Sequence, residues 1–120
     1  MSQDLILAAI KKNAKFFLDE AGEFYPFGMC ITWENEIVPV AFNSDKESPK
    51  SVFVLEELKT RLKKYIESGA FSKAAIAFDV KIDSESGSQD AVVVLLYEMG
   101  KNETEHRFTY AMEDGEVKYI

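Results

Sequence analysis

Apolar side chains recur at helical spacing in two stretches of the chain. In the first stretch, residues 3–21, one side of a helix would carry Ile6, Ile10, Ala14, Phe17 and Ala21. Steps of three and four residues place side chains on one face, so this stretch predicts an amphipathic helix packed against a core. Gly22 follows and suits the position just past a helix end, because glycine accepts the left-handed conformation there.

The second helical stretch has clear boundary signals at both ends. Ser48 is a suitable N-cap, and Pro49 suits the first helical position because no amide donor is needed there. Gly69 ends the pattern. The apolar stripe between them consists of Leu55, Leu58, Leu62 and Ile66. Charged side chains occupy the opposite side, which predicts a helix that buries one face and exposes the other.

Alternating and continuous apolar runs predict six strands in the remaining sequence: residues 27–33, 36–42, 73–83, 91–99, 104–112 and 117–120. Glu34-Asn35 is predicted as a tight turn, and Asp114-Gly115 as a type I′ turn. Pro39 lacks an amide donor, so its strand belongs at an edge or bulges there. Residues 91–99 are apolar at successive positions, which is typical of a central strand covered on both faces or lying at an interface.

The predicted order of elements is α-β-β-α-β-β-β-β, within a single domain spanning residues 1–120. Loops near the C-terminus are too short for a crossover helix, so the strands that they join form an antiparallel meander. Two helices on one face of a curved antiparallel sheet of about six strands satisfy these patterns. The predicted fold class is therefore α+β.

The chain carries 14 basic and 21 acidic side chains, a net charge of −7 with His106 neutral. Phosphate binding needs a concentrated positive surface, so nucleic acid is not an expected partner. The densest acidic groups fall at predicted turns, residues 34–36, 83–90 and 113–116. A fold that gathers these turns at one end would make an acidic docking face, whereas a fold that scatters them would leave solubility as their role.

The sequence favours a cytoplasmic protein without a membrane-spanning segment. Its single cysteine, Cys30, has no partner for an intramolecular disulfide. The apolar run at residues 5–10 is shorter than a secretory leader requires. The longest apolar run, residues 91–97, is far shorter than the about 20 residues of a membrane-spanning helix.

Candidate catalytic groups are few. A cysteine–histidine pair would have to join Cys30 to His106, and neither residue lies in a sequence context that marks it as reactive. Two such side chains are too few for a structural zinc site, the acids around residues 83–90 lack EF-hand spacing, and glycine-rich phosphate-binding motifs are missing. We therefore expect no catalytic residue, no metal site and no cofactor, which favours a protein that is not an enzyme.

The segment at residues 23–28, Glu-Phe-Tyr-Pro-Phe-Gly, gathers three aromatic side chains around a proline. It predicts a hydrophobic corner that holds the first helix on the sheet, or alternatively an exposed aromatic anchor for a partner. With the preceding helix and the run Glu36-Ile37-Val38-Pro39-Val40, it resembles a group of small uncharacterised bacterial proteins, some of which are thought to be immunity proteins of toxin systems. The resemblance covers about residues 16–42 and assigns no catalytic residue.

Three functional hypotheses remain open. The first is a non-enzymatic immunity-type inhibitor that binds a basic protein such as a toxin through predicted hairpin tips, at Trp33, Glu34, Glu36, Glu85 and Asp90. The second is a small-molecule-binding or hydrolytic domain with a pocket between helices and sheet, lined by Cys30, Asp79, His106 and Tyr110. The third is a homodimerisation module in which residues 91–99 lie at the interface.

Overall fold

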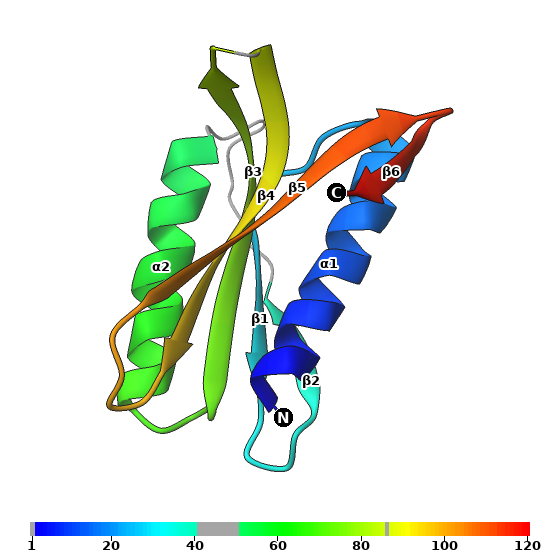
Figure 1. The fold of residues 1–120 in the computed structure, drawn as a ribbon. Coiled ribbons are helices and arrows are strands. Elements are labelled where there is room, and N and C mark those ends of the chain that lie inside the picture. Colours follow the sequence, from blue (N-terminus) through cyan, green and yellow to red (C-terminus); the bar gives the residue numbers. More distant parts are fainter. Residues whose placement is uncertain (1, 41–50, 86) are drawn as a thin grey trace.

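The computed structural model of the chain describes residues 2–40, 51–85 and 87–120 (Figure 1). Its elements are α1 (Ser2–Ala21), β1 (Phe27–Ile31), β2 (Ile37–Val40), α2 (Ser51–Glu67), β3 (Lys73–Ser84), β4 (Gly87–Glu98), β5 (Thr104–Glu113) and β6 (Glu116–Tyr119). This order and the α+β class are as predicted. The predicted cap of the second helix, Ser48 with Pro49, lies outside the described residues.

The strands form one curled antiparallel sheet in the order β2-β1-β3-β4-β5-β6. β3 and β4 pair along their whole length, from Lys73 opposite Glu98 to Ser84 opposite Gly87. The β1–β2 and β4–β5 turns lie at the Lys73 end of β3, because Ile31 pairs with Lys73 and Leu96 pairs with Thr104. The β3–β4 and β5–β6 turns lie at the opposite end (Figure 1).

The two helices cover opposite faces of the sheet, so the prediction that both cover one face is wrong (Figure 1). Even-numbered residues of β4 pack with α1 and odd-numbered ones with α2, because successive strand side chains point to opposite faces. Residues 91–97 are all buried in this way. The central-strand interpretation of residues 91–97 is confirmed, whereas Met99, at the end of the run that was proposed as a homodimer interface, is exposed.

Each helix packs through a stripe close to the predicted one. The fully or almost fully buried helical side chains are Ile6, Ile10, Ala14 and Leu18 on α1 and Val54, Leu58, Leu62 and Ile66 on α2. Phe17 and Ala21, which were predicted in the first stripe, are exposed, and Leu55 of the second is only partly buried. The stripe on α1 continues in steps of four to its end, so Leu18 takes the place assigned to Phe17.

Gly28 allows α2 to approach β1 closely. A Cβ atom at this position would lie 3.0 Å from Cδ1 of Leu62, which is tighter than ordinary van der Waals contact. Leu62 is itself fully buried and so has little space to move. The last residue of the aromatic segment is thus a glycine for a packing reason, because any side chain there would push against the helix.

Of the two predicted hairpin turns, the β5–β6 turn has the predicted type and the β1–β2 turn is one residue longer than predicted. Trp33, Glu34 and Asn35 form a three-residue β1–β2 turn, where a two-residue turn had been predicted. The amide of Asn35 donates to the carbonyl of Thr32 at 3.0 Å, and Asn35 has a φ of 67°, which asparagine tolerates better than most residues. The β5–β6 turn is as predicted, with positive φ at both Asp114 and Gly115. β2 is an edge strand, as Pro39 predicted.

Candidate functional site

The four residues predicted to line a pocket do not meet at one site. Cys30 packs on the α2 side of the sheet, whereas Asp79, His106 and Tyr110 belong to strand positions on the α1 side. His106 lies four residues from Tyr110 along β5, a separation of about 13 Å. Only Asp79 and Tyr110 contact each other.

Cys30 has the environment of an unreactive thiol. Its side chain is fully buried and lies among the residues that pack against α2. Burial raises the pKa of the thiol to about 12. The reactive thiolate is therefore almost absent at neutral pH, and His106, on the other side of the sheet, cannot act as its base.

Asp79 and Tyr110 form a polar contact at the margin of the α1-facing core. The Tyr110 hydroxyl donates to Oδ1 of Asp79 at 2.7 Å. Burial raises the pKa of Asp79 above its ordinary value, with contributions from the carboxylates of Asp90 and Glu23, and the Tyr110 hydroxyl partly opposes this rise. In the sheet, Asp79 lies opposite Val92 and Tyr110 lies opposite Asp90, so this contact joins β3 to β5 across β4.

One end of the molecule gathers most of the predicted acidic turns. We call it the acidic end and define it by Asp19, Glu20, Glu23, Asp79, Asp83, Glu85, Asp90, Glu113, Asp114 and Glu116. These residues come from the end of α1 and the loop after it, the β3–β4 hairpin and the β5–β6 hairpin, which all lie at the same end of the sheet (Figure 1). The structure thus brings Glu85 and Asp90 of the predicted partner-binding set into one region. Asp90 lies within β4, opposite Lys81, and so is not at the hairpin tip as predicted.

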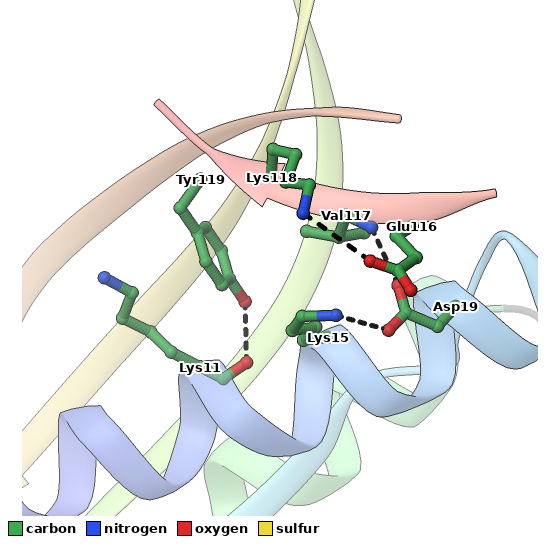
Figure 2. A network of polar contacts seen from close by, with 7 residues as sticks. All are labelled: Lys11, Lys15, Asp19, Glu116, Val117, Lys118 and Tyr119. Atoms are coloured by element: carbon green, nitrogen blue, oxygen red, sulfur yellow. Dashed lines mark hydrogen bonds and ion pairs between the residues drawn. The ribbon is translucent and has the colours of Figure 1, made fainter. Parts of the chain in front are cut away.

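The contact between α1 and β6 fixes part of this end (Figure 2). Oδ1 of Asp19 accepts the Val117 amide at 2.7 Å, and Oδ2 accepts Lys15 Nζ at 2.6 Å. The Tyr119 hydroxyl donates to the carbonyl of Lys11 at 2.7 Å, and Lys11 Nζ lies 4.7 Å from the centre of the Tyr119 ring. β6 is therefore held against α1 by two hydrogen bonds that each join a side chain to a backbone group, in addition to apolar contacts.

Aromatic side chains lie beside the acidic end. The rings of Phe17, Phe24 and Phe27 contact one another with centroid separations of 5.4 to 6.3 Å. The predicted hydrophobic corner is confirmed by these contacts, because they join α1 to the start of β1. Phe16 and Tyr25 remain 60% and 51% exposed next to this cluster. The segment therefore holds the fold together and also presents aromatic surface.

The remaining predicted partner residues, Trp33, Glu34 and Glu36, lie in the β1–β2 turn at the other end of the sheet. The two ends of β3 are separated by about 36 Å, so these residues cannot share one contact with Glu85. Trp33 Nε1 donates to the carbonyl of Gly69 at 2.7 Å, which ties the turn to the loop after α2. The Trp33 ring is nevertheless 59% exposed.

A pocket of about 310 Å³ lies at this second end, between α2 and the β4–β5 turn. Its lining consists of Lys63, Ile66 and Glu67 with residues 97–103. The Tyr97 hydroxyl is buried, and among the described residues no partner lies within hydrogen-bond distance of it, with the Glu103 carboxylate nearby. Burial raises the pKa of Tyr97, the nearby Glu103 carboxylate raises it further, and Lys63 Nζ lies 5.8 Å from the ring centre.

Glu98 is one of the residues that line this pocket, and its carboxylate contacts two lysine side chains. Oε2 of Glu98 lies 2.8 Å from Lys73 Nζ and 3.0 Å from Lys101 Nζ. The hydrogen bond from Lys73 lowers the pKa of Glu98, so the carboxyl group is ionised at neutral pH. Sequence reasoning placed Tyr97 in an apolar core strand and missed its hydroxyl. The available signal was a tyrosine, which needs a polar partner, at the end of an otherwise aliphatic run.

Among residues 2–40, 51–85 and 87–120, no three histidine, cysteine, aspartate or glutamate side chains are grouped to hold a metal ion. Neither described helix is long and apolar enough to cross a membrane. No model of a known protein family, no curated protein sequence and no solved structure matches this chain.

Proposed function

We propose that the chain is a non-enzymatic protein-binding domain of the immunity-inhibitor type, acting in the cytoplasm, and that its acidic end binds a basic surface of another protein. The observation that carries this proposal is the location of three acidic segments at the same end of the sheet, beside exposed aromatic rings. Residues 16–42 resemble a group of small uncharacterised bacterial proteins, and some of these are thought to be immunity proteins, which agrees with this function.

The charge distribution suits rapid recognition of a basic partner. Residues 19–23, 79–90 and 113–119 hold ten acidic side chains and two basic ones. A surface of one sign attracts an oppositely charged protein over several ångströms and speeds association, up to about 10⁸–10⁹ M⁻¹ s⁻¹ at low salt. A toxin that binds nucleic acid carries a basic surface of this kind, because it must contact phosphates.

The exposed aromatic rings supply apolar contact that charge alone does not provide. The Phe16 ring contacts the Phe17 ring, with 5.8 Å between their centroids, and Tyr25 follows Phe24 of the same cluster directly in the chain. Aromatic side chains of this kind dominate the energy of many interfaces because they bury a large area with little loss of conformational entropy. Long-range attraction and short-range contact are thus available at the same end.

Neutralising charge at each end of the molecule tests the proposal. The acidic-end variant carries three substitutions, Glu85→Gln, Glu113→Gln and Asp114→Asn. The matched control removes the same charge at the opposite end, with Glu34→Gln, Glu36→Gln and Glu67→Gln. Both sets are exposed side chains, and asparagine accepts the positive φ of Asp114. The folds of both variants should therefore remain intact.

Affinity capture from cells of the source organism, followed by binding measurements at several salt concentrations, gives the readout. We expect the wild type and the control to capture the same basic protein, and the acidic-end variant to bind it at least about tenfold more weakly. Capture of an acidic protein, capture of none, or a loss of binding confined to the control variant would contradict the proposal.

A second candidate function is small-molecule binding in the Tyr97 pocket. The specific observation is the Tyr97 hydroxyl, which is buried beside Glu103 and has no partner within hydrogen-bond distance among the described residues. A buried hydroxyl without a partner costs about 1–3 kcal/mol, and a ligand acceptor would remove that cost. The lining carries ammonium groups on Lys63 and Lys101 and carboxylates on Glu67 and Glu103. Charges of both signs favour a small zwitterion, such as a free amino acid.

Titration calorimetry with a panel of free amino acids tests this second candidate. The expected result is binding of at least one amino acid by the wild type and weaker binding by Tyr97→Phe. Tyr110→Phe is the matched control, since it removes a hydroxyl on the other side of the sheet and should leave binding unchanged. Absence of binding across the panel, or equal weakening by both variants, would overturn it.

A further inference from the structure

Part of the outer edge of β5 has no neighbouring strand (Figure 1). β5 begins at Thr104, but its pairing with β6 starts only at Tyr110. One further hydrogen bond, from the Ile120 amide to the Thr109 carbonyl at 2.9 Å, extends this contact by a residue. Residues 104–108 therefore present an open strand edge within the described part of the chain.

Other edges of the sheet are protected. The Val117 amide on β6 donates to Asp19, so α1 covers that strand's outer side. β2 is four residues long and contains Pro39, which has no amide to donate. Among the described residues, no strand or helix gives β5 comparable cover along residues 104–108.

The hydrogen bond between Ile120 and Thr109 shows which backbone groups of β5 face outward. The Thr109 carbonyl points away from β4, and the pattern in a strand repeats every two residues. The amide and carbonyl groups of Glu105 and Arg107 therefore face the same open side. These two residues are also exposed at their side chains, where Arg107 Nε lies 2.9 Å from Glu105 Oε2.

We infer that two copies of the chain pair antiparallel along this edge, about a twofold axis that passes beside His106. In this register Glu105 lies opposite Arg107 of the partner subunit, and each such pair exchanges two backbone hydrogen bonds. The Glu105–Arg107 ion pair seen within one strand then becomes two ion pairs across the interface. Opposite charges at directly opposed positions stabilise an antiparallel pair.

Charge selects this register over its neighbours. A shift of the pairing centre to residue 105 places two glutamates opposite each other, and a shift to residue 107 places two arginines opposite each other. Both arrangements are disfavoured by repulsion. The antiparallel arrangement also directs the acidic ends of the two copies away from each other, so the net charge of −7 on each chain does not prevent association.

The interface involves a short strand segment from each copy, so we expect a weak dimer whose fraction rises with protein concentration. Sedimentation equilibrium from micromolar to millimolar protein measures it. Arg107→Glu and Glu105→Arg should each raise the dimer dissociation constant about tenfold or more, because like charges then face each other. Lys12→Glu, an exposed charge reversal on α1, is the matched control and should leave it unchanged.

Two further samples separate edge pairing from a general charge effect. The double variant Glu105→Arg with Arg107→Glu restores opposite charges in the same register and should regain wild-type association. A mixture of the two single variants should form a heterodimer, since one copy then presents two glutamates and the other two arginines. A wild type that stays monomeric at millimolar concentration, or a dimer that is unaffected by Arg107→Glu, would overturn the inference.

Cross-linking tests the register directly. His106 faces itself across the twofold axis, so His106→Cys should form a disulfide-linked dimer under mild oxidation with oxidised glutathione. Thr104→Cys is the matched control, because Thr104 lies opposite Phe108 of the partner subunit and the two introduced thiols stay far apart. Equal cross-linking of both variants would contradict this register. No cross-linking of His106→Cys would also contradict it, and is the result expected if the edge instead binds a peptide of another protein.

Discussion

A single polar side chain, Asp19, attaches the last strand of the sheet to the first helix. Asp19 on α1 accepts both the Val117 amide of β6 and the ammonium group of Lys15. The lysine and the amide lower the pKa of Asp19 below its ordinary value. Because the folded state then favours the ionised form, the stability from Asp19 is complete above about pH 4 and is lost as the pH falls through the lower, folded-state pKa.

Replacement of Asp19 by alanine should therefore loosen β6 at neutral pH. We expect faster hydrogen exchange of the Val117 amide and a smaller loss of stability on acidification than in the wild type. The control is Glu20→Ala, which removes a neighbouring exposed carboxylate that does not contact β6. Exchange measured by NMR, with acid unfolding followed by circular dichroism, checks both expectations. An unchanged Val117 exchange rate would count against the role given to Asp19.

Two tyrosines with opposite hydrogen-bonding states allow a second test at the scale of single residues. Among the described residues, no partner lies within hydrogen-bond distance of the Tyr97 hydroxyl, whereas the Tyr110 hydroxyl donates to Asp79. Tyr97→Phe should raise the free energy of unfolding of the unliganded protein by about 1 kcal/mol, and Tyr110→Phe should lower it by about 1–2 kcal/mol. Urea unfolding measures both changes. Destabilisation by Tyr97→Phe would indicate that its hydroxyl has a stabilising partner after all.

At the scale of elements, local sequence patterns predicted every helix and strand that the structure describes. They did not predict which face of the sheet each helix covers. Apolar stripes located both helices, and Asp114-Gly115 located a type I′ turn. The assignment of both helices to one face failed because a helix stripe does not say which face of a sheet it meets. The continuous apolar run at residues 91–97 held the missing information, since a strand buried on both faces needs cover on both.

The packing of α2 on β1 gives a prediction at this scale. Gly28→Ala should destabilise the fold by about 1 kcal/mol, because the added methyl group meets Leu62 at 3.0 Å in a filled core. Leu62→Val shortens that side chain, so Gly28→Ala should cost less in the Leu62→Val background. Thermal or urea unfolding of the two single variants and the double variant measures this coupling. Strict additivity would show that the two side chains do not compete for the same space.

At the scale of the whole molecule, the sheet register decides what the acidic turns can do. The sequence showed where the acidic groups were dense but not which of them would meet, because this depends on strand pairing between distant segments. Glu85 and Asp90 lie at the same end of the sheet as the end of α1 and the β5–β6 hairpin, whereas Glu34 and Glu36 lie at the opposite end. The Tyr97 pocket was equally hidden, since it forms only where α2 ends beside the β4–β5 turn.

The most direct test of the central claim is an NMR footprint of the captured protein on the isotopically labelled chain. The account predicts that amide signals of the acidic end, including those of Tyr25, Asp90 and Val117, shift or broaden on binding. Signals of Trp33, Glu34 and Glu36 should remain unchanged. A footprint centred on the β1–β2 turn or on the Tyr97 pocket, with the acidic end unaffected, would contradict the claim.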